Sequence, residues 1–144
     1  MQNYANSWPF WALMAAVFAA LTAVFAKLGV SGVNSNFATF LRTLVVVAAF
    51  VPLLWATGEF ESLSALSGRT ALFLVLSGLA TGASWLCYFR ALQIGQASQV
   101  APVDKLSVVF VAVIGALFLG ERLSATGWSG VALIAAGAVL VAVG

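Results

Sequence analysis

The chain alternates between long apolar runs and short polar stretches. A membrane-spanning helix needs roughly 20 apolar residues, each adding about 1.5 Å. The runs of that length cover about residues 8–30, 36–56, 70–92, 98–118 and 126–143. The polar stretches between them are too short to fold on their own. We therefore predict an all-α polytopic membrane protein with five transmembrane helices, in one domain over residues 1–144.

Composition supports the same class. Hydrophobic residues make up 63% of the chain and charged residues only 7%, outside the range of soluble domains. The lipid bilayer is therefore the expected environment. A net charge of +2 without a basic run argues against binding of nucleic acid. With one cysteine, Cys87, and no histidine, the sequence holds no metal or redox motif, so we expect no metal and no cofactor.

The ends and loops of the spans carry no orientation signal. The N-terminus lacks the features of a cleaved signal peptide, so the first run is expected to remain as a helix. Arg69 and Arg122 fall on one side of the membrane, and Lys27 and Arg90 on the other. Basic residues normally mark the cytoplasmic side. A chain without this bias can insert both ways, and we expect an antiparallel homodimer. The alternative is that a basic residue within the membrane fixes one orientation.

Two spans carry small residues at helix-packing intervals. Gly130, Gly137 and Gly144 recur every seven residues, and Gly78 and Gly82 are separated by four. Small residues let two helices approach closely in a membrane. The pattern is equally compatible with packing inside the chain and with a dimer seam.

Charged residues inside the predicted spans are the strongest functional signal. Burying each costs about 2.5 to 3.5 kcal/mol, so they mark functional sites by default. Arg42 and Asp104 both lie roughly 9 Å inside, entering from the same side. Lys105, Gln99 and Ser107 accompany Asp104 on the fourth span. We interpret these residues as walls of a substrate-binding cavity, and Asp104 as the candidate for proton coupling. The alternative is a buried structural ion pair between Asp104 and either Arg42 or Lys105.

Pro102 interrupts the hydrogen bonding of the fourth span. A proline in a helix interior cannot donate to the carbonyl four residues back, here that of Ser98, and its ring clashes with that turn. We expect this end of the span to be kinked and propose Pro102 as a hinge. The alternative is that the proline merely packs, as prolines in membrane helices can.

One face of the third span combines hydroxyl and aromatic side chains. Thr81, Ser84, Trp85 and Tyr88 are separated by three, four and seven residues, which places them together. Such a face suits a ligand with an apolar body and a polar group. We interpret Thr81, Trp85 and Tyr88 as substrate-binding; an aromatic belt at the membrane surface is the alternative.

Four short motifs in order resemble the EamA domain of the drug/metabolite transporter superfamily, over nearly the whole chain. They are YFRAL at 88–92, VAPV at 100–103, GERLS at 120–124 and GVALIAAG at 130–137. Typical members carry two such domains in inverted orientation, whereas this chain carries one. The resemblance implies half of an inverted-repeat fold, rebuilt by an antiparallel homodimer. It also implies a central cavity lined by the first four helices, with the fifth peripheral.

The resemblance also guides the interpretation of the charged residues. Glu121 and Arg122 match the motif at the end of the fourth helix and are read as structural. Related small multidrug exporters use a carboxylate in their first helix, but residues 8–30 contain no acid. The deep charges Arg42, Lys105 and Asp104 sum to a positive value, which favours an anionic or zwitterionic ligand.

We therefore expect a secondary transporter of a small polar metabolite in a prokaryotic inner (plasma) membrane. Two alternatives are a non-transporting scaffold or accessory subunit and a cation or drug exporter of the small multidrug type. The sequence shows no nucleophile–base pair and no metal cluster, so an enzyme is not expected.

Overall fold

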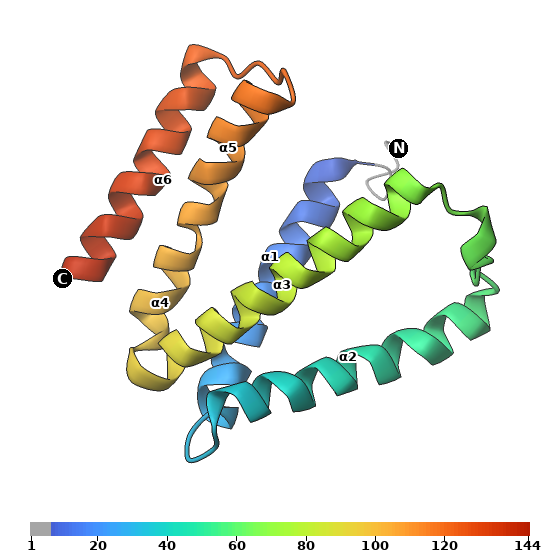
Figure 1. Ribbon diagram of the computed structural model, residues 1–144. Helices are drawn as coiled ribbons and strands as arrows, with labels where there is room; N and C mark the ends of the chain where they lie inside the picture. Colours follow the sequence, from blue (N-terminus) through green and yellow to red (C-terminus); the bar gives the residue numbers. More distant parts are fainter. Residues whose placement is uncertain (1–6) are drawn as a thin grey trace, which may run out of the picture. The chain divides into compact units, whose positions relative to one another are not determined.

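The computed structural model describes residues 7–144, and its regular elements are helices. In chain order they are α1 (Trp8–Gly29), α2 (Ser35–Thr57), the short 3₁₀ helix η2 (Leu63–Ala65), α3 (Gly68–Ile94), α4 (Ala97–Asp104), α5 (Leu106–Phe118) and α6 (Ala125–Val143) (Figure 1). The first six residues of the expected domain lie outside the described part of the chain.

Five helical spans are long and apolar enough to cross a membrane, and α4 and α5 together form one of them. This confirms the predicted all-α membrane fold. The largest difference in bounds is at the third span, predicted at 70–92 and found at Gly68–Ile94. Large apolar side chains are exposed along every span, as expected for surfaces that face lipid.

Polar side chains define where the helices begin. The Asn34 side chain accepts hydrogen bonds from the backbone N–H groups two and three residues later, at the start of α2. The Ser67 hydroxyl accepts from the N–H of Thr70, and the Ser124 hydroxyl from that of Gly127. Each cap satisfies N–H groups that the first turn of a helix leaves without partners.

The described chain forms two compact units, one from residues 26–93 and the other from residues 7–25 together with residues 94–144. In the first unit, α2 ends at Gly58, which has a φ of 70°. The N–H groups of Gly58 and Glu59 bond to the carbonyls of Trp55 and Leu54. This Schellman motif requires a left-handed residue, which explains the glycine.

In the second unit, α6 packs along both α4 and α5 (Figure 1). The turn between α5 and α6 closes on Gly115, whose carbonyl accepts from the N–H groups of Leu119 and Glu121, at 3.1 and 3.0 Å. A Cβ on Gly115 would lie 2.7 Å from Glu121 Oε2, so the Glu121 side chain folds back against this buried glycine. The geometry supports the structural role expected for Glu121.

The fourth span is interrupted at Lys105, one turn after Pro102, between α4 and α5. The Lys105 N–H is shared between the carbonyls of Ala101 and Pro102, at 3.3 and 3.1 Å, and the Val108 N–H bonds to the carbonyl of Lys105 at 3.0 Å. The bonds to Pro102 and Lys105 span three residues and close tighter turns than those of an α-helix. The disturbance expected at this end of the span is therefore present, whereas a hinge motion at Pro102 stays a prediction.

Candidate functional site

Arg42 lies against two aromatic rings of α3. Its guanidinium carbon is 4.2 Å from the centre of the Trp85 ring and 5.5 Å from the centre of the Phe89 ring. Both distances are within the range of a cation–π interaction, in which the negative face of the ring attracts the cation. The contact joins α2 to α3 and brings together Arg42 and Trp85, both predicted to bind substrate.

The polar side chains beside Arg42 on α2 bond to their own helix and not to the guanidinium. The hydroxyls of Thr39 and Thr43 donate to carbonyls of their own helix, each at 2.8 Å. The carboxylates of residues 26–93 are Glu59 and Glu61, in the loop after α2, and neither forms an ion pair with Arg42. Within this unit, the guanidinium is therefore stabilised by aromatic faces rather than by a carboxylate.

The predicted face of α3 is only partly assembled around Arg42. Tyr88 is half-buried and lies three residues after Trp85 on α3. Thr81 is exposed, and its hydroxyl donates to the carbonyl of Ser77 at 2.8 Å. Phe89, 4% exposed, also contacts Arg42 and was not predicted, because its ring carries no polar group that marks it on an apolar helix. Its spacing of four residues from Trp85 is the signal that would have found it.

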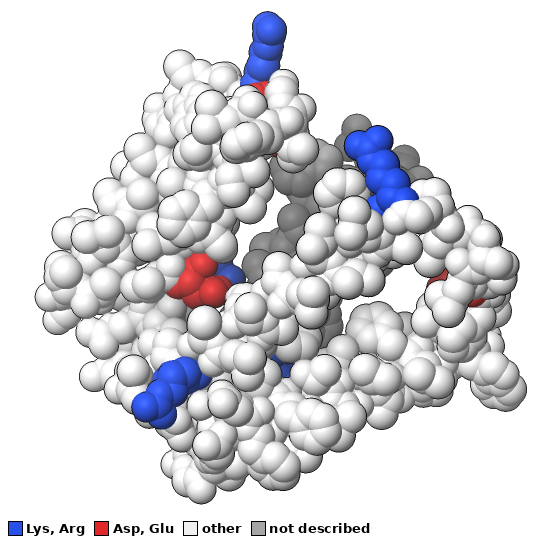
Figure 2. Space-filling view, viewed as in Figure 1, with Lys and Arg blue, Asp and Glu red and all other residues white. Residues whose placement is uncertain are grey.

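The candidate residues of the other unit centre on an ion pair between neighbours. Lys105 Nζ lies 3.1 Å from Asp104 Oδ2, and the two side chains are 54% and 34% exposed. Of the two alternatives for an Asp104 ion pair, the one with Lys105 is found, but it is not buried. Gln99 and Pro102 are half-buried, and Ser107 is exposed. Figure 2 shows charged side chains as small, separate patches on an otherwise uncharged surface.

A second polar group lies at the end of α1 and was not predicted. Lys27 Nζ donates to the carbonyl of Leu92 at 2.7 Å, and Gln93 Nε2 donates to the carbonyl of Val33 at 2.9 Å. Arg90 Nη1 in turn donates to Gln93 Oε1 at 2.8 Å. The Leu92 carbonyl is one of the last four of α3, which have no partner within the helix. These bonds therefore satisfy the end of α3 and tie the loop after α1 to it.

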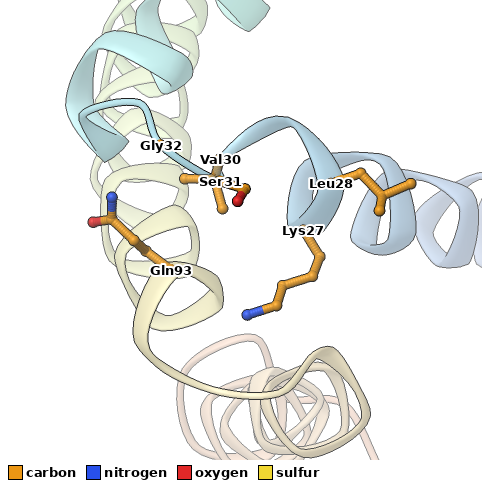
Figure 3. Close-up of a pocket in the computed structure, with 6 residues that line it drawn as sticks. All are labelled: Lys27, Leu28, Val30, Ser31, Gly32 and Gln93. Carbon is orange, nitrogen blue, oxygen red and sulfur yellow. The ribbon is translucent and has the colours of Figure 1, made fainter.

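A pocket of about 500 Å³ opens beside these bonds (Figure 3). It is lined by Lys27 and Leu28 of α1, Val30, Ser31 and Gly32 of the following loop, and Gln93 of α3. Among residues 7–144, no group of three histidine, cysteine, aspartate or glutamate side chains could hold a metal ion.

Comparison with known proteins gives two matches. Residues 6–143 match the family described as the EamA-like transporter family. A protein of Sinorhizobium sp, named "Uncharacterized transporter in cobO 3'region", is 61% identical over 138 residues. The alignment covers 96% of this chain and 98% of that protein. No solved structure matches.

Proposed function

The chain belongs to the EamA-like transporter family, and from this premise we propose that it is a secondary transporter of a small anionic or zwitterionic metabolite. It is an integral membrane protein whose family and relative indicate transport rather than catalysis. The proposed membrane is the prokaryotic inner membrane, which fits a bacterial relative of nearly the same length.

The observation that carries the proposal is the position of Arg42. The guanidinium lies within a spanning helix, against Trp85 and Phe89, and forms no ion pair with a carboxylate of its unit. A guanidinium carries five N–H donors in a planar fork, more than contact with ring faces uses. Two of these donors can bind a carboxylate or phosphate through parallel hydrogen bonds. Arg42 is thus suited to recognise an anion.

The ion pair in the other unit supports the choice of Arg42, and not Lys105, as the residue that binds the anionic group. Asp104 contacts Lys105, which partly neutralises that ammonium and leaves Arg42 as the better candidate for the anionic group of a ligand. In this proposal Asp104 is the group that takes up a proton, because it is the deepest carboxylate of the spans. Two chains would insert in opposite directions and form the cavity together, as an antiparallel homodimer.

The proposal is tested by uptake into proteoliposomes with three labelled probes: a mixture of amino acids, a sugar phosphate and tetraphenylphosphonium. We expect uptake of an amino acid or of the sugar phosphate, lost in Arg42→Gln. Arg42→Lys keeps the positive charge but loses the planar donors, so it should also reduce uptake. Arg69→Lys is its matched control, because Arg69 also lies over an aromatic ring, that of Phe73 at 5.9 Å, but at the start of α3. It keeps the count of basic residues, and its uptake should stay near that of the wild type.

Each other outcome contradicts a stated part of the proposal. Uptake of tetraphenylphosphonium alone would indicate a cation exporter, and no uptake of any probe by the folded protein would favour a scaffold or accessory subunit. If a proton gradient drives uptake, Asp104→Asn should remove the dependence on the gradient but keep exchange of substrate across the membrane. Gradient-driven uptake that persists in this variant would exclude Asp104 as the proton carrier.

A further inference from the structure

The pocket at the end of α1 lies in a basic region of its unit. Lys27 lines it, and Arg90 is bonded to a second lining residue, Gln93. The carboxylates of residues 26–93, Glu59 and Glu61, lie in the loop at the other end of α2. Because α2 has 23 residues, about 35 Å of helix separates the two ends. Within this unit, positive charge is concentrated beside the pocket.

The lining residues are held in place by bonds to the backbone. Lys27 is fixed at the Leu92 carbonyl and Gln93 at the Val33 carbonyl. The bond to the Leu92 carbonyl orients the ammonium beside the pocket. Gly32, with a φ of 78°, turns the loop around the pocket and adds no side chain to it. The pocket thus has a fixed cation, the Ser31 hydroxyl and a volume of about 500 Å³, within the range of small-ligand sites.

We propose that this pocket binds a phosphate group, at a site separate from Arg42 and independent of the proposed transport function. Lysine binds phosphate as a point charge, and the hydroxyl of Ser31 adds a hydrogen-bond donor. Lys27 lies in the last turn of α1, where a spanning helix reaches the membrane surface. Basic pockets between spanning helices at that depth bind lipid headgroups. The phosphate is that of an anionic lipid or of a water-soluble compound, and the chemistry is shared.

The test uses the full chain, purified in detergent and depleted of lipid. Native mass spectrometry measures retention of phosphatidylglycerol against phosphatidylcholine, and thermal unfolding is measured with inorganic phosphate against chloride at equal ionic strength. We expect preferential retention of phosphatidylglycerol for a lipid ligand, or stabilisation by phosphate for a soluble one. In Lys27→Gln either effect should fall about fivefold, as for loss of one basic contact. Lys27→Arg should keep most of it.

Two further variants separate binding from folding. Arg122→Gln removes one positive charge from the turn before α6 and should leave retention unchanged. Ser31→Leu keeps the ammonium and fills the pocket, so it should reduce retention even if Lys27→Gln does not fold. If Lys27→Gln unfolds more easily but neither ligand shows preference in the wild type, Lys27 only satisfies the end of α3. Equal retention by Ser31→Leu and wild type would also overturn the proposal.

Discussion

At the scale of single residues, the cation of Arg42 is accommodated without a carboxylate in its unit. Charge inside a membrane is costly unless it is paired or reaches water. The faces of Trp85 and Phe89 supply part of the compensation, because cation–π attraction strengthens as water is removed. Neutral rings hold the guanidinium in place and do not compete with an anionic ligand for its N–H donors. A carboxylate paired with Arg42 would compete with the ligand.

This arrangement predicts the effect of removing the larger ring. Trp85→Leu should lower the free energy of unfolding by about 1 to 2 kcal/mol, because Arg42 loses its cation–π partner. Trp55→Leu is the matched control, since Trp55 is 80% exposed near the end of α2. Thermal or denaturant unfolding of both purified variants in detergent measures the difference. Equal destabilisation would show that the Arg42–Trp85 contact contributes nothing specific.

At the scale of the helices, the two prolines inside spans behave differently. The α2 helix continues through Pro52 from Ser35 to Thr57, whereas the fourth span is interrupted at Lys105 after Pro102. A proline removes one hydrogen bond in either place. The difference is that polar Asp104 and Lys105 follow Pro102, whereas apolar residues follow Pro52. The two spans thus differ in the residues that follow the proline as well as in whether the helix continues.

We predict that Pro102→Ala will reduce transport more than it affects folding. The alanine restores an N–H that can bond to the Ser98 carbonyl, and it should make the fourth span stiffer. Pro52→Ala makes the same change in the uninterrupted α2. Initial rates of uptake in proteoliposomes, normalised to folded protein, should fall severalfold for the first variant and little for the second. Equal rates in both variants would exclude Pro102 as a hinge.

The helices were predictable to a far greater extent than the contacts between them. Apolar runs and their polar ends set the spans, because a membrane requires a minimum length and complete backbone hydrogen bonding. The place of Arg42 within the second span followed from the number of residues between it and the start of that apolar run. Its partner Phe89 was harder to predict, since an apolar ring on an apolar helix is marked only by its spacing of four residues from Trp85. The bond from Lys27 to the Leu92 carbonyl joins residues 65 positions apart through a backbone atom that every residue possesses.

At the scale of the whole molecule, the loops carry a balanced set of basic residues. If the five spans cross the membrane in turn, Arg69 and Arg122 fall at one side and Lys27 and Arg90, near their helix ends, at the other. Orientation in the membrane follows such counts in short loops. A balanced count gives the inserted chain no preferred direction, which is the basis of the proposed antiparallel homodimer.

The prediction is that reporters fused to the C-terminus will be found on both sides of the membrane. The double variant Arg69→Gln, Arg122→Gln removes the basic residues from one side and should give a single orientation, with Lys27 and Arg90 facing the cytoplasm. Paired fusions to a periplasmic phosphatase and a cytoplasmic fluorescent protein measure the two populations. A wild-type chain found on one side only would contradict dual insertion and, with it, the antiparallel homodimer.

The packing of α6 has a consequence for any bending at Lys105. Because α6 packs along both α4 and α5, it crosses the interruption and holds the two segments of the fourth span in line. The fourth span can bend there only if one of its two segments slides over α6. The eight residues of α4 form the shorter arm, and the thirteen of α5 the longer, which the turn at Gly115 ties to α6. The shorter arm packs against α6 at least as extensively as the longer one, so any bending at Lys105 must give up part of the contact between α4 and α6.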